Sequence, residues 1–157
     1  MPSVRTHLWF GNNQAVEAAS FYAEHIPDSK VTRVFTARTE PDKPVAEVVE
    51  FTVAGHEVIG LSAGPEFHLD DAFSFYLRVD GQDEVDHFWD ILTADGGEPG
   101  PCGWCKDKYG VSWQVIPSEL EELSGDYTSA ANQRVCQAML KMGKIDVAQL
   151  RAAYDGG

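Results

Sequence analysis

The sequence has only three cysteines and no long run of apolar residues. An odd number of cysteines in a chain of 157 residues does not suggest a disulfide framework. No apolar stretch approaches the roughly 20 residues of a membrane-spanning helix. The first residues, MPSVRTHLWFGNN, lack the apolar segment of a secretory signal peptide. We therefore expect a cytoplasmic protein that does not bind membranes.

Basic residues are also scarce. Twelve Lys and Arg stand against 25 Asp and Glu, which gives a formal net charge of −13. Such a surface repels the phosphate backbone of nucleic acids and anionic lipid headgroups, so we expect neither among the partners. Hydrophobic residues, at 43%, are numerous enough for a globular domain with a substantial core.

Two similar halves make up most of the chain. The first is expected to hold a strand over 4–10, a helix over 14–26 and strands over 29–38, 45–53 and 57–63. The second is expected to hold a strand over 73–80, a helix over 81–97 and strands over 98–106 and 111–117. At an offset of 67 residues (88 minus 21), Phe21–Tyr22 meets Phe88–Trp89. We predict a single domain over 1–157, made of two tandem modules, 1–64 and 72–118, and a helical extension over 128–154.

Local patterns specify several positions in these elements. Asn12 or Asn13 can cap the first helix, and Asp146 can cap a last helix over 146–154 that follows another over 129–142. Asp107 and Gly110 suit the first and fourth positions of a type I turn. A buried stripe on the second helix is predicted at Val85, Phe88, Trp89 and Leu92, with Trp113 as a further core residue. Burial is also predicted for six apolar residues of the extension: Met139, Leu140, Met142, Ile145, Val147 and Leu150.

Cys102 and Cys105 form a C-x-x-C spacing. A catalytic pair of this kind sits at a helix N-terminus, whereas here a turn and a strand follow. A structural zinc site needs four ligands, and the chain has neither a second pair nor an H-x₃₋₅-H spacing. We interpret the two cysteines as residues of a loop or strand, with a redox or zinc site as the less favoured alternative.

Four stretches of the sequence resemble a known family: FYAEHIPDSKV, FSFYLRVDGQDEVDHFWDIL, GGEPGPCGWCKDKYGVSWQVIP and AMLKMGKIDVAQLRAA. They are similar to the PhnB-like proteins, often labelled 3-demethylubiquinone-9 3-methyltransferase, of the vicinal oxygen chelate (glyoxalase, bleomycin resistance and dioxygenase) superfamily. The resemblance extends over almost the whole chain. It implies an α+β fold of tandem βαβββ modules that form a curved mixed sheet around a cavity, and it implies that homodimers are common.

The resemblance also implies where a metal would bind. Ligands of metal-dependent members come from the first and last strands of each module, and these positions map to His7, Gly60, Ser74 and Gln114, with Ser62 as an alternative to Gly60. Glycine has no side chain and a serine hydroxyl is a poor ligand, whereas a catalytic metal usually needs three protein ligands. We therefore predict no metal and no other cofactor; a divalent metal is the alternative.

Without a metal, the cavity of this fold would have aromatic walls and a few hydrogen-bonding groups, as small-molecule sites do. The residues expected to line it are His7, Trp9, Ser74, Tyr76, Trp104, Ser112 and Gln114. His7 could act as a general base, since imidazole titrates near neutral pH, or could be an ordinary hydrogen-bonded residue. Trp9 and Tyr76 could equally be packing residues. No catalytic residue can be assigned.

Three hypotheses for function follow. The favoured one is a metal-free homodimer that binds an unidentified small molecule. The alternatives are a metal-dependent lyase, isomerase or dioxygenase of the same superfamily, and a protein that engages a partner through its acidic surface and helical extension. A methyltransferase activity is not favoured, because the chain lacks the G-x-G-x-x-G turn and the parallel strand order of a nucleotide-binding sheet.

Overall fold

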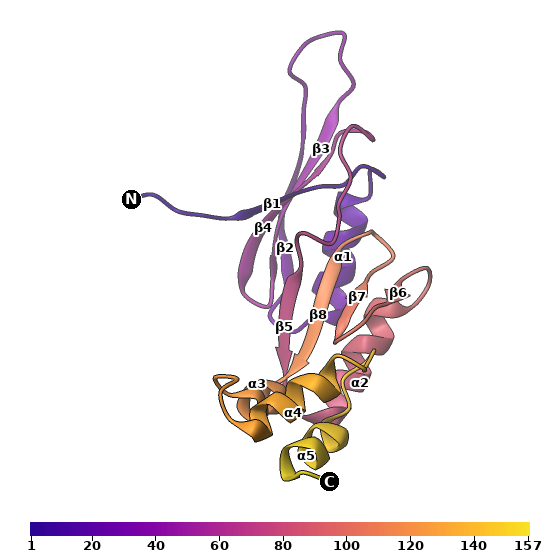
Figure 1. The fold of residues 1–157 in the computed structure, drawn as a ribbon. Helices are drawn as coiled ribbons and strands as arrows, with labels where there is room; N and C mark the ends of the chain where they lie inside the picture. Colours follow the sequence, from indigo (N-terminus) through magenta and orange to yellow (C-terminus); the bar gives the residue numbers. More distant parts are fainter. The chain divides into compact units, whose positions relative to one another are not determined.

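A computed structural model describes all residues, 1–157, and divides into two compact units, Met1–Leu69 and Asp70–Gly157. Each unit contains one mixed four-stranded sheet with a helix on one face, as Figure 1 shows. This arrangement confirms the α+β fold of repeated βαβββ modules. No helix has both the length and the apolar character needed to cross a membrane.

The first unit consists of five elements: β1 (Thr6–Trp9), α1 (Ala15–His25), β2 (Lys30–Ala37), β3 (Ala46–Val53) and β4 (His56–Ser62). The strand order is β1-β4-β3-β2, with β1 parallel to β4 and the other pairs antiparallel. Three alanines of α1 are fully buried beside Tyr22, whose ring lies 6.1 Å from that of Phe51. Small side chains on the helix allow its close packing against the sheet.

The start of α1 differs from the prediction. The residue at the cap position is Gln14, whose side chain makes no capping hydrogen bond, so the expected asparagine cap is wrong. Instead the Ser62 hydroxyl at the end of β4 accepts a hydrogen bond from the Ala15 amide at 3.0 Å. Asn13 adopts a positive φ of 60°, and its carboxamide oxygen accepts from the Gly64 amide at 2.9 Å.

The second unit repeats this pattern. It begins with β5 (Phe75–Val79), α2 (Gly81–Thr93), β6 (Glu98–Pro99), β7 (Trp104–Lys106) and β8 (Ser112–Pro117). The strand order is β5-β8-β7-β6, and β5 is parallel to β8 just as β1 is to β4. The predicted stripe of α2 is buried, and Trp113 on β8 is only 1% exposed, so these core predictions are confirmed.

Residues 98–106 are not one strand, as predicted, but a hairpin of β6 and β7. The turn closes through hydrogen bonds from the Trp104 amide to the Pro101 carbonyl (2.9 Å) and from the Gly100 amide to the Trp104 carbonyl (2.8 Å). Cys102 and Gly103 both have positive φ, 57° and 82°. Since left-handed residues cannot continue an extended strand, the chain reverses there.

Three helices form the C-terminal extension: α3 (Ser118–Ser124), α4 (Ala130–Met139) and α5 (Val147–Asp155). In Figure 1, α3 and α4 lie beyond the ends of β5 and β8. Helix α3 was not predicted, because its seven residues include only two apolar side chains. Asp146 caps α5 as predicted, accepting a hydrogen bond from the Gln149 amide.

The apolar residues of the extension are only partly buried. Ile145, Val147 and Leu150 are in the core of the second unit, together with Val135 of α4. Met139 and Met142 are half-buried. Leu140 is 66% exposed, so its predicted burial is wrong. It follows the last turn of α4, and the chain turns away there into the loop before α5.

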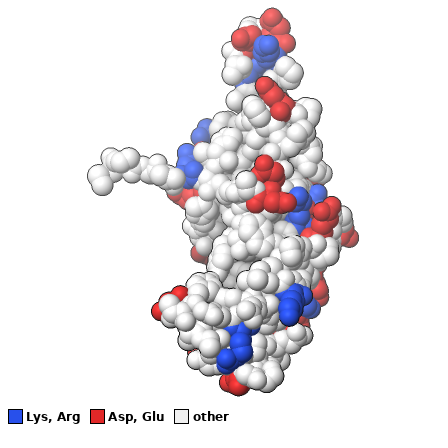
Figure 2. Space-filling view, in the orientation of Figure 1, with Lys and Arg blue, Asp and Glu red and all other residues white.

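Charged residues are unevenly distributed over the face shown in Figure 2. Uncharged atoms occupy most of that face in spite of the net charge of −13. Lys and Arg groups are visible in the region of the C-terminal helices. Lys141, Lys144 and Arg151 border a groove in this part of the chain. Lys144 pairs with Asp86 of α2 at 2.8 Å, which ties this segment to the module.

Candidate functional site

The sheet of the second unit has two chemically different faces. Because side chains alternate along a strand, Phe75, Cys105 and Trp113 point toward α2. The opposite face carries a central row of three residues paired across the sheet, Tyr76 on β5, Gln114 on β8 and Trp104 on β7. This face, which we call the open face, has no helix of its own module covering it.

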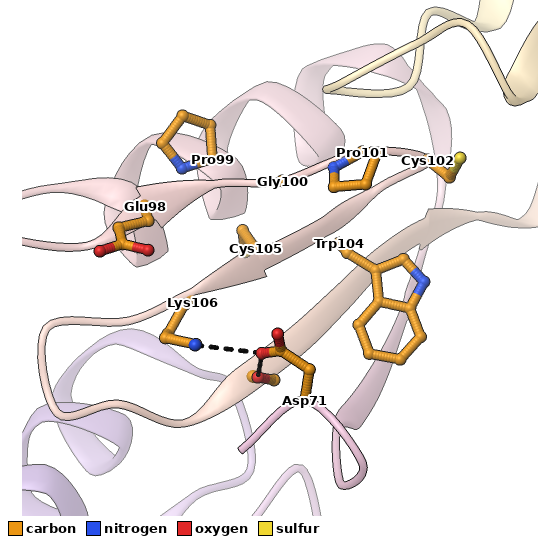
Figure 3. Close-up of a pocket in the computed structure, with 10 residues that line it drawn as sticks. Asp71, Glu98, Pro99, Gly100, Pro101, Cys102, Trp104, Cys105 and Lys106 are labelled. Carbon is orange, nitrogen blue, oxygen red and sulfur yellow. Dashed lines mark hydrogen bonds and ion pairs between the residues drawn. The ribbon is translucent and has the colours of Figure 1, made fainter. Parts of the chain in front are cut away.

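A cavity of about 410 Å³ adjoins the open face at the β6–β7 hairpin (Figure 3). It is lined by Asp71, Ser112, Trp104, Cys105, Lys106 and hairpin residues 98–102. Its polar groups are arranged around Asp71, which precedes β5. The Asp71 Oδ1 atom accepts a hydrogen bond from the Ser112 hydroxyl at 2.9 Å and pairs with Lys106 Nζ at 3.1 Å.

Asp71 is therefore an ionised and oriented acceptor. The hydrogen bond from Ser112, followed by the contact with Lys106, lowers the pKa of Asp71 below its ordinary value. Both contacts use Oδ1, and Oδ2 makes no hydrogen bond within the chain. One oxygen of the carboxylate is thus available to a bound molecule.

A second cavity, of about 230 Å³, lies between the open face and the extension. It is lined by the central row and by residues of α3 and α4. Glu121 of α3 accepts from the Tyr76 hydroxyl at 3.0 Å and from Arg78 Nε at 2.9 Å, which fastens the helix to the sheet. Desolvation, and then Glu121, raise the pKa of Tyr76 to about 12, so Tyr76 remains a neutral phenol at physiological pH.

Trp104 lines both cavities and is the tryptophan whose ring is least engaged. Trp9 donates its indole N–H to the Gly64 carbonyl at 2.9 Å, and Trp113 donates to Asp107 at 2.9 Å. Trp89 is buried in the core. Trp104 is half-buried and makes neither a hydrogen bond through its indole nor a ring contact within the chain.

Four of the seven predicted cavity residues lie on the second unit's sheet, and a fifth, Ser74, directly precedes β5; the four are Tyr76, Trp104, Ser112 and Gln114. Gln114 Nε2 donates to the Ser74 hydroxyl at 3.1 Å. His7 and Trp9 belong to β1 of the first unit, where His7 is exposed and Trp9 contacts Phe67 edge-on at 5.0 Å.

The positions mapped as metal ligands supply few donor atoms within each unit. A Cβ atom at Gly60 would lie 2.9 Å from Val49 Cγ1 and 3.3 Å from Ala15 Cβ, so Gly60 faces α1, as does Ser62. His7 pairs with Ile59 and therefore lies on the other face of the sheet. Ser74 and Gln114 bond to each other, and no group of three or more His, Cys, Asp or Glu side chains could hold a metal ion. These donors do not fit a divalent metal.

Asp71, Lys106, Glu98 and Glu121 were not among the residues predicted from the sequence. Lys106 follows Trp104 by two residues, and this alternation could have placed it on the same face. Asp71 lies in the loop before β5 and Glu121 in the unpredicted helix, so no periodic pattern identifies either of them.

The C-x-x-C residues lie in a turn and a strand, as interpreted from the sequence. Cys102 occupies the hairpin turn and Cys105 faces α2 from β7, and both thiols are free. Burial, and then the charge of Asp107, raise the pKa of Cys105 to about 12, so its reactive thiolate form is disfavoured.

Similar structures support the fold. The PhnB protein of Bacillus cereus is 25% identical, covers 74% of this chain and 99% of its own length, and superposes with a TM-score of 0.61. The protein PA1353 of Pseudomonas aeruginosa is 20% identical over 74% of this chain and 98% of its own, with a TM-score of 0.58. The fosfomycin resistance protein FosX of Listeria monocytogenes is 15% identical over 77% and 94%, with a TM-score of 0.55. A comparison with curated proteins found no match.

The sequence itself matches one family over residues 2–116, well over half of the chain. The match ends within β8, so the helical extension lies outside it. The resemblance noted in the sequence did include the extension. The two βαβββ modules and the neighbouring structures agree with this match. The chain therefore belongs to the 3-demethylubiquinone-9 3-methyltransferase family, the PhnB-like branch of the vicinal oxygen chelate superfamily.

Proposed function

We propose that this protein binds a small planar molecule on the open face of the second unit, without a metal ion. The observation that carries the proposal is Trp104, an unengaged indole between cavities of about 410 and 230 Å³. Small-molecule sites typically combine aromatic walls with a few placed polar groups, and volumes of roughly 300–1,000 Å³ are usual. The larger cavity falls in this range.

The polar groups beside Trp104 favour binding over catalysis. Asp71 is held by Ser112 and Lys106, so these three side chains form a preorganised cluster. Tyr76 is kept protonated and bonded to Glu121. Groups fixed in this way position a ligand by hydrogen bonds. His7, on β1 of the first unit, stays a candidate general base, but we assign no reaction to it.

A metal-dependent lyase, isomerase or dioxygenase is the alternative, since FosX shares the fold and has been crystallised with manganese(II). The donors described above argue against it for this chain. A methyltransferase activity is not part of the proposal either. The sheets here are mixed and carry no glycine-rich strand-to-helix turn of the nucleotide-binding type.

A thermal-shift screen of planar aromatic compounds tests the proposal. The full chain is screened in the presence of a chelator and again with manganese(II), nickel(II) or iron(II), alongside Trp104→Leu. Tyr154→Leu is the matched control, because Tyr154 is an exposed aromatic residue of α5 that lines neither cavity. A ligand at about 100 times its Kd stabilises the native state by about 2.7 kcal/mol.

We expect hits that stabilise the wild type and Tyr154→Leu in chelator but not Trp104→Leu. Stabilisation that requires an added metal would favour the alternative. Compounds that stabilise Trp104→Leu as much as the wild type would indicate a binding site elsewhere.

We further propose that the protein acts as a cytoplasmic homodimer without nucleic-acid or membrane partners, as the family resemblance and the net charge of −13 suggest. Size-exclusion chromatography with light scattering is expected to give twice the chain mass of 17.3 kDa. A monomer throughout the micromolar range would contradict the dimer.

A further inference from the structure

We propose that the ligand of the larger cavity is a small planar organic cation, such as an aromatic amidine, held by Asp71 and Glu98 against the ring of Trp104. This inference rests on the proposed function and names the class of molecule that the site accepts.

The charge of the cavity favours a cation. Its charged side chains are Asp71, Glu98 and Lys106. Lys106 is already paired with Asp71, while Glu98 makes no ion pair although Lys106 lies opposite it in the β6–β7 register. One negative charge therefore has no cationic partner. An anion that approached Lys106 would, in contrast, be repelled by the carboxylates of Asp71 and Glu98.

The orientation of Asp71 favours a ligand that donates hydrogen bonds. Ser112 and Lys106 both engage Oδ1, which orients the carboxylate of the 74% exposed Asp71 side chain and leaves Oδ2 without a partner in the chain. In Figure 3 the Asp71 carboxylate lies between the Lys106 amine and the Trp104 ring. An N–H group of a cationic ligand that bonds to Oδ2 would form a charge-assisted hydrogen bond.

The walls favour a planar molecule. The indole of Trp104 has no partner in the chain, and Pro99 and Pro101 line the same cavity. A flat cation with delocalised charge gains both dispersion and cation–π attraction over an indole ring. The net charge of −13 also raises the local concentration of cations around the protein.

Three probes of one shape and different charge test the inference: benzamidine, benzamide and benzoate. Each is titrated into the ¹⁵N-labelled full chain in chelator, and the indole N–H signal of Trp104 reports binding. We expect benzamidine to bind at least about tenfold more tightly than benzamide, with benzoate weakest.

Charge variants identify the residues responsible. Asp71→Asn and Glu98→Gln are each expected to weaken benzamidine binding by about tenfold and to change benzamide binding by less than about twofold. Asp71→Asn is also expected to strengthen benzoate binding, because Lys106 loses its partner. Glu122→Gln, which removes the same charge from an exposed position on α3, is the control and is expected to leave all three affinities unchanged.

Several outcomes would overturn the inference. Benzamide or benzoate binding as tightly as benzamidine would exclude the cation preference while leaving the site at Trp104 intact. A Trp104 signal that none of the probes moves, or benzamidine binding unaffected by both charge variants, would also overturn it. The proposed function is tested separately by the broader screen, so the two failures can be told apart.

Discussion

At the scale of single residues, Asp107 organises the last hairpin of the second unit. Its buried carboxylate accepts from the amides of Tyr109 and Val111 at 2.9 and 3.0 Å through Oδ1, and from the Trp113 indole at 2.9 Å through Oδ2. The sequence predicted the turn from Asp107 to Gly110, which closes at 3.0 Å. It could not predict the bond to Trp113, because that bond depends on how two strands pair.

Asp107→Ala is expected to lower the free energy of unfolding by about 2–4 kcal/mol, since it leaves buried donors without an acceptor. Urea denaturation followed by circular dichroism measures this loss. Asp155→Ala, at an exposed position of α5, is the control and should change stability by less than about 0.5 kcal/mol. Equal effects of the two variants would mean that the hydrogen bonds of Asp107 contribute little.

The thiol of Cys105 is a second prediction at this scale. Its pKa of about 12 lies above the ordinary value, so at a pH of about 8 almost all of it is unreactive thiol. We expect iodoacetamide to modify Cys105 only as fast as the protein unfolds, and all three cysteines to react in guanidinium. Mass spectrometry of the peptides measures this order. Rapid labelling of Cys105 in the native protein would contradict its burial and its raised pKa.

At the scale of elements, the extension is an integral part of the second unit. Gln82 of α2 donates to the Ile145 carbonyl at 2.9 Å and accepts from the Val147 amide at 2.8 Å, which fixes the start of α5. The amides of Cys102 and Gly103 donate to the carbonyls of residues 142 and 143, each at 2.8 Å. The loop between α4 and α5 therefore supports the hairpin that lines the larger cavity.

Two apolar residues of the extension form a matched pair for measuring this packing. Ile145 is fully buried and Leu140 is 66% exposed. Ile145→Ala is expected to cost about 2–5 kcal/mol of stability and Leu140→Ala less than about 0.5 kcal/mol. Urea denaturation distinguishes them. Similar losses for both would contradict the packing described.

Removal of both α4 and α5 should be more severe. Truncation after Ser124 deletes Val135, Ile145 and Leu150, all fully buried, and uncovers the side chains they contact. We expect aggregated or unfolded protein, assessed by size-exclusion chromatography and near-ultraviolet circular dichroism. A soluble, cooperatively folding truncated chain would show that the modules are stable without α4 and α5.

Element boundaries show where sequence patterns succeed and fail. The stripe of α2 was predictable because four apolar residues recur at helical spacing. The β6–β7 turn was not, since it depends on Cys102 adopting a positive φ, which non-glycine residues rarely do. The same limit affected the face assigned to Gly60. A shift of one residue along a strand exchanges the two faces of the sheet, and sequence spacing alone did not reveal that Gly60 faces α1.

At the scale of the whole molecule, repetition was the most informative signal. The two Phe-aromatic pairs that are 67 residues apart lie on α1 and α2. Each helix packs on a sheet in which the first and last strands of the module in chain order, β1 and β4 or β5 and β8, are parallel neighbours. The candidate site was harder to predict than the fold. Trp104, Tyr76, Ser112 and Gln114 of the open face were predicted from the sequence. The cluster around Asp71 was not, because it depends on how the loop before β5 folds.

Trp104 and its surroundings are proposed to bind a small planar ligand without a metal. The most direct measurement is a ¹H–¹⁵N spectrum of the four tryptophan indoles, recorded in chelator while a hit from the thermal-shift screen is added. We expect a saturable shift of the Trp104 signal, with the signals of Trp89 and Trp113 unmoved. A Trp104 signal that stays fixed, or that moves only after a divalent metal is added, would contradict it.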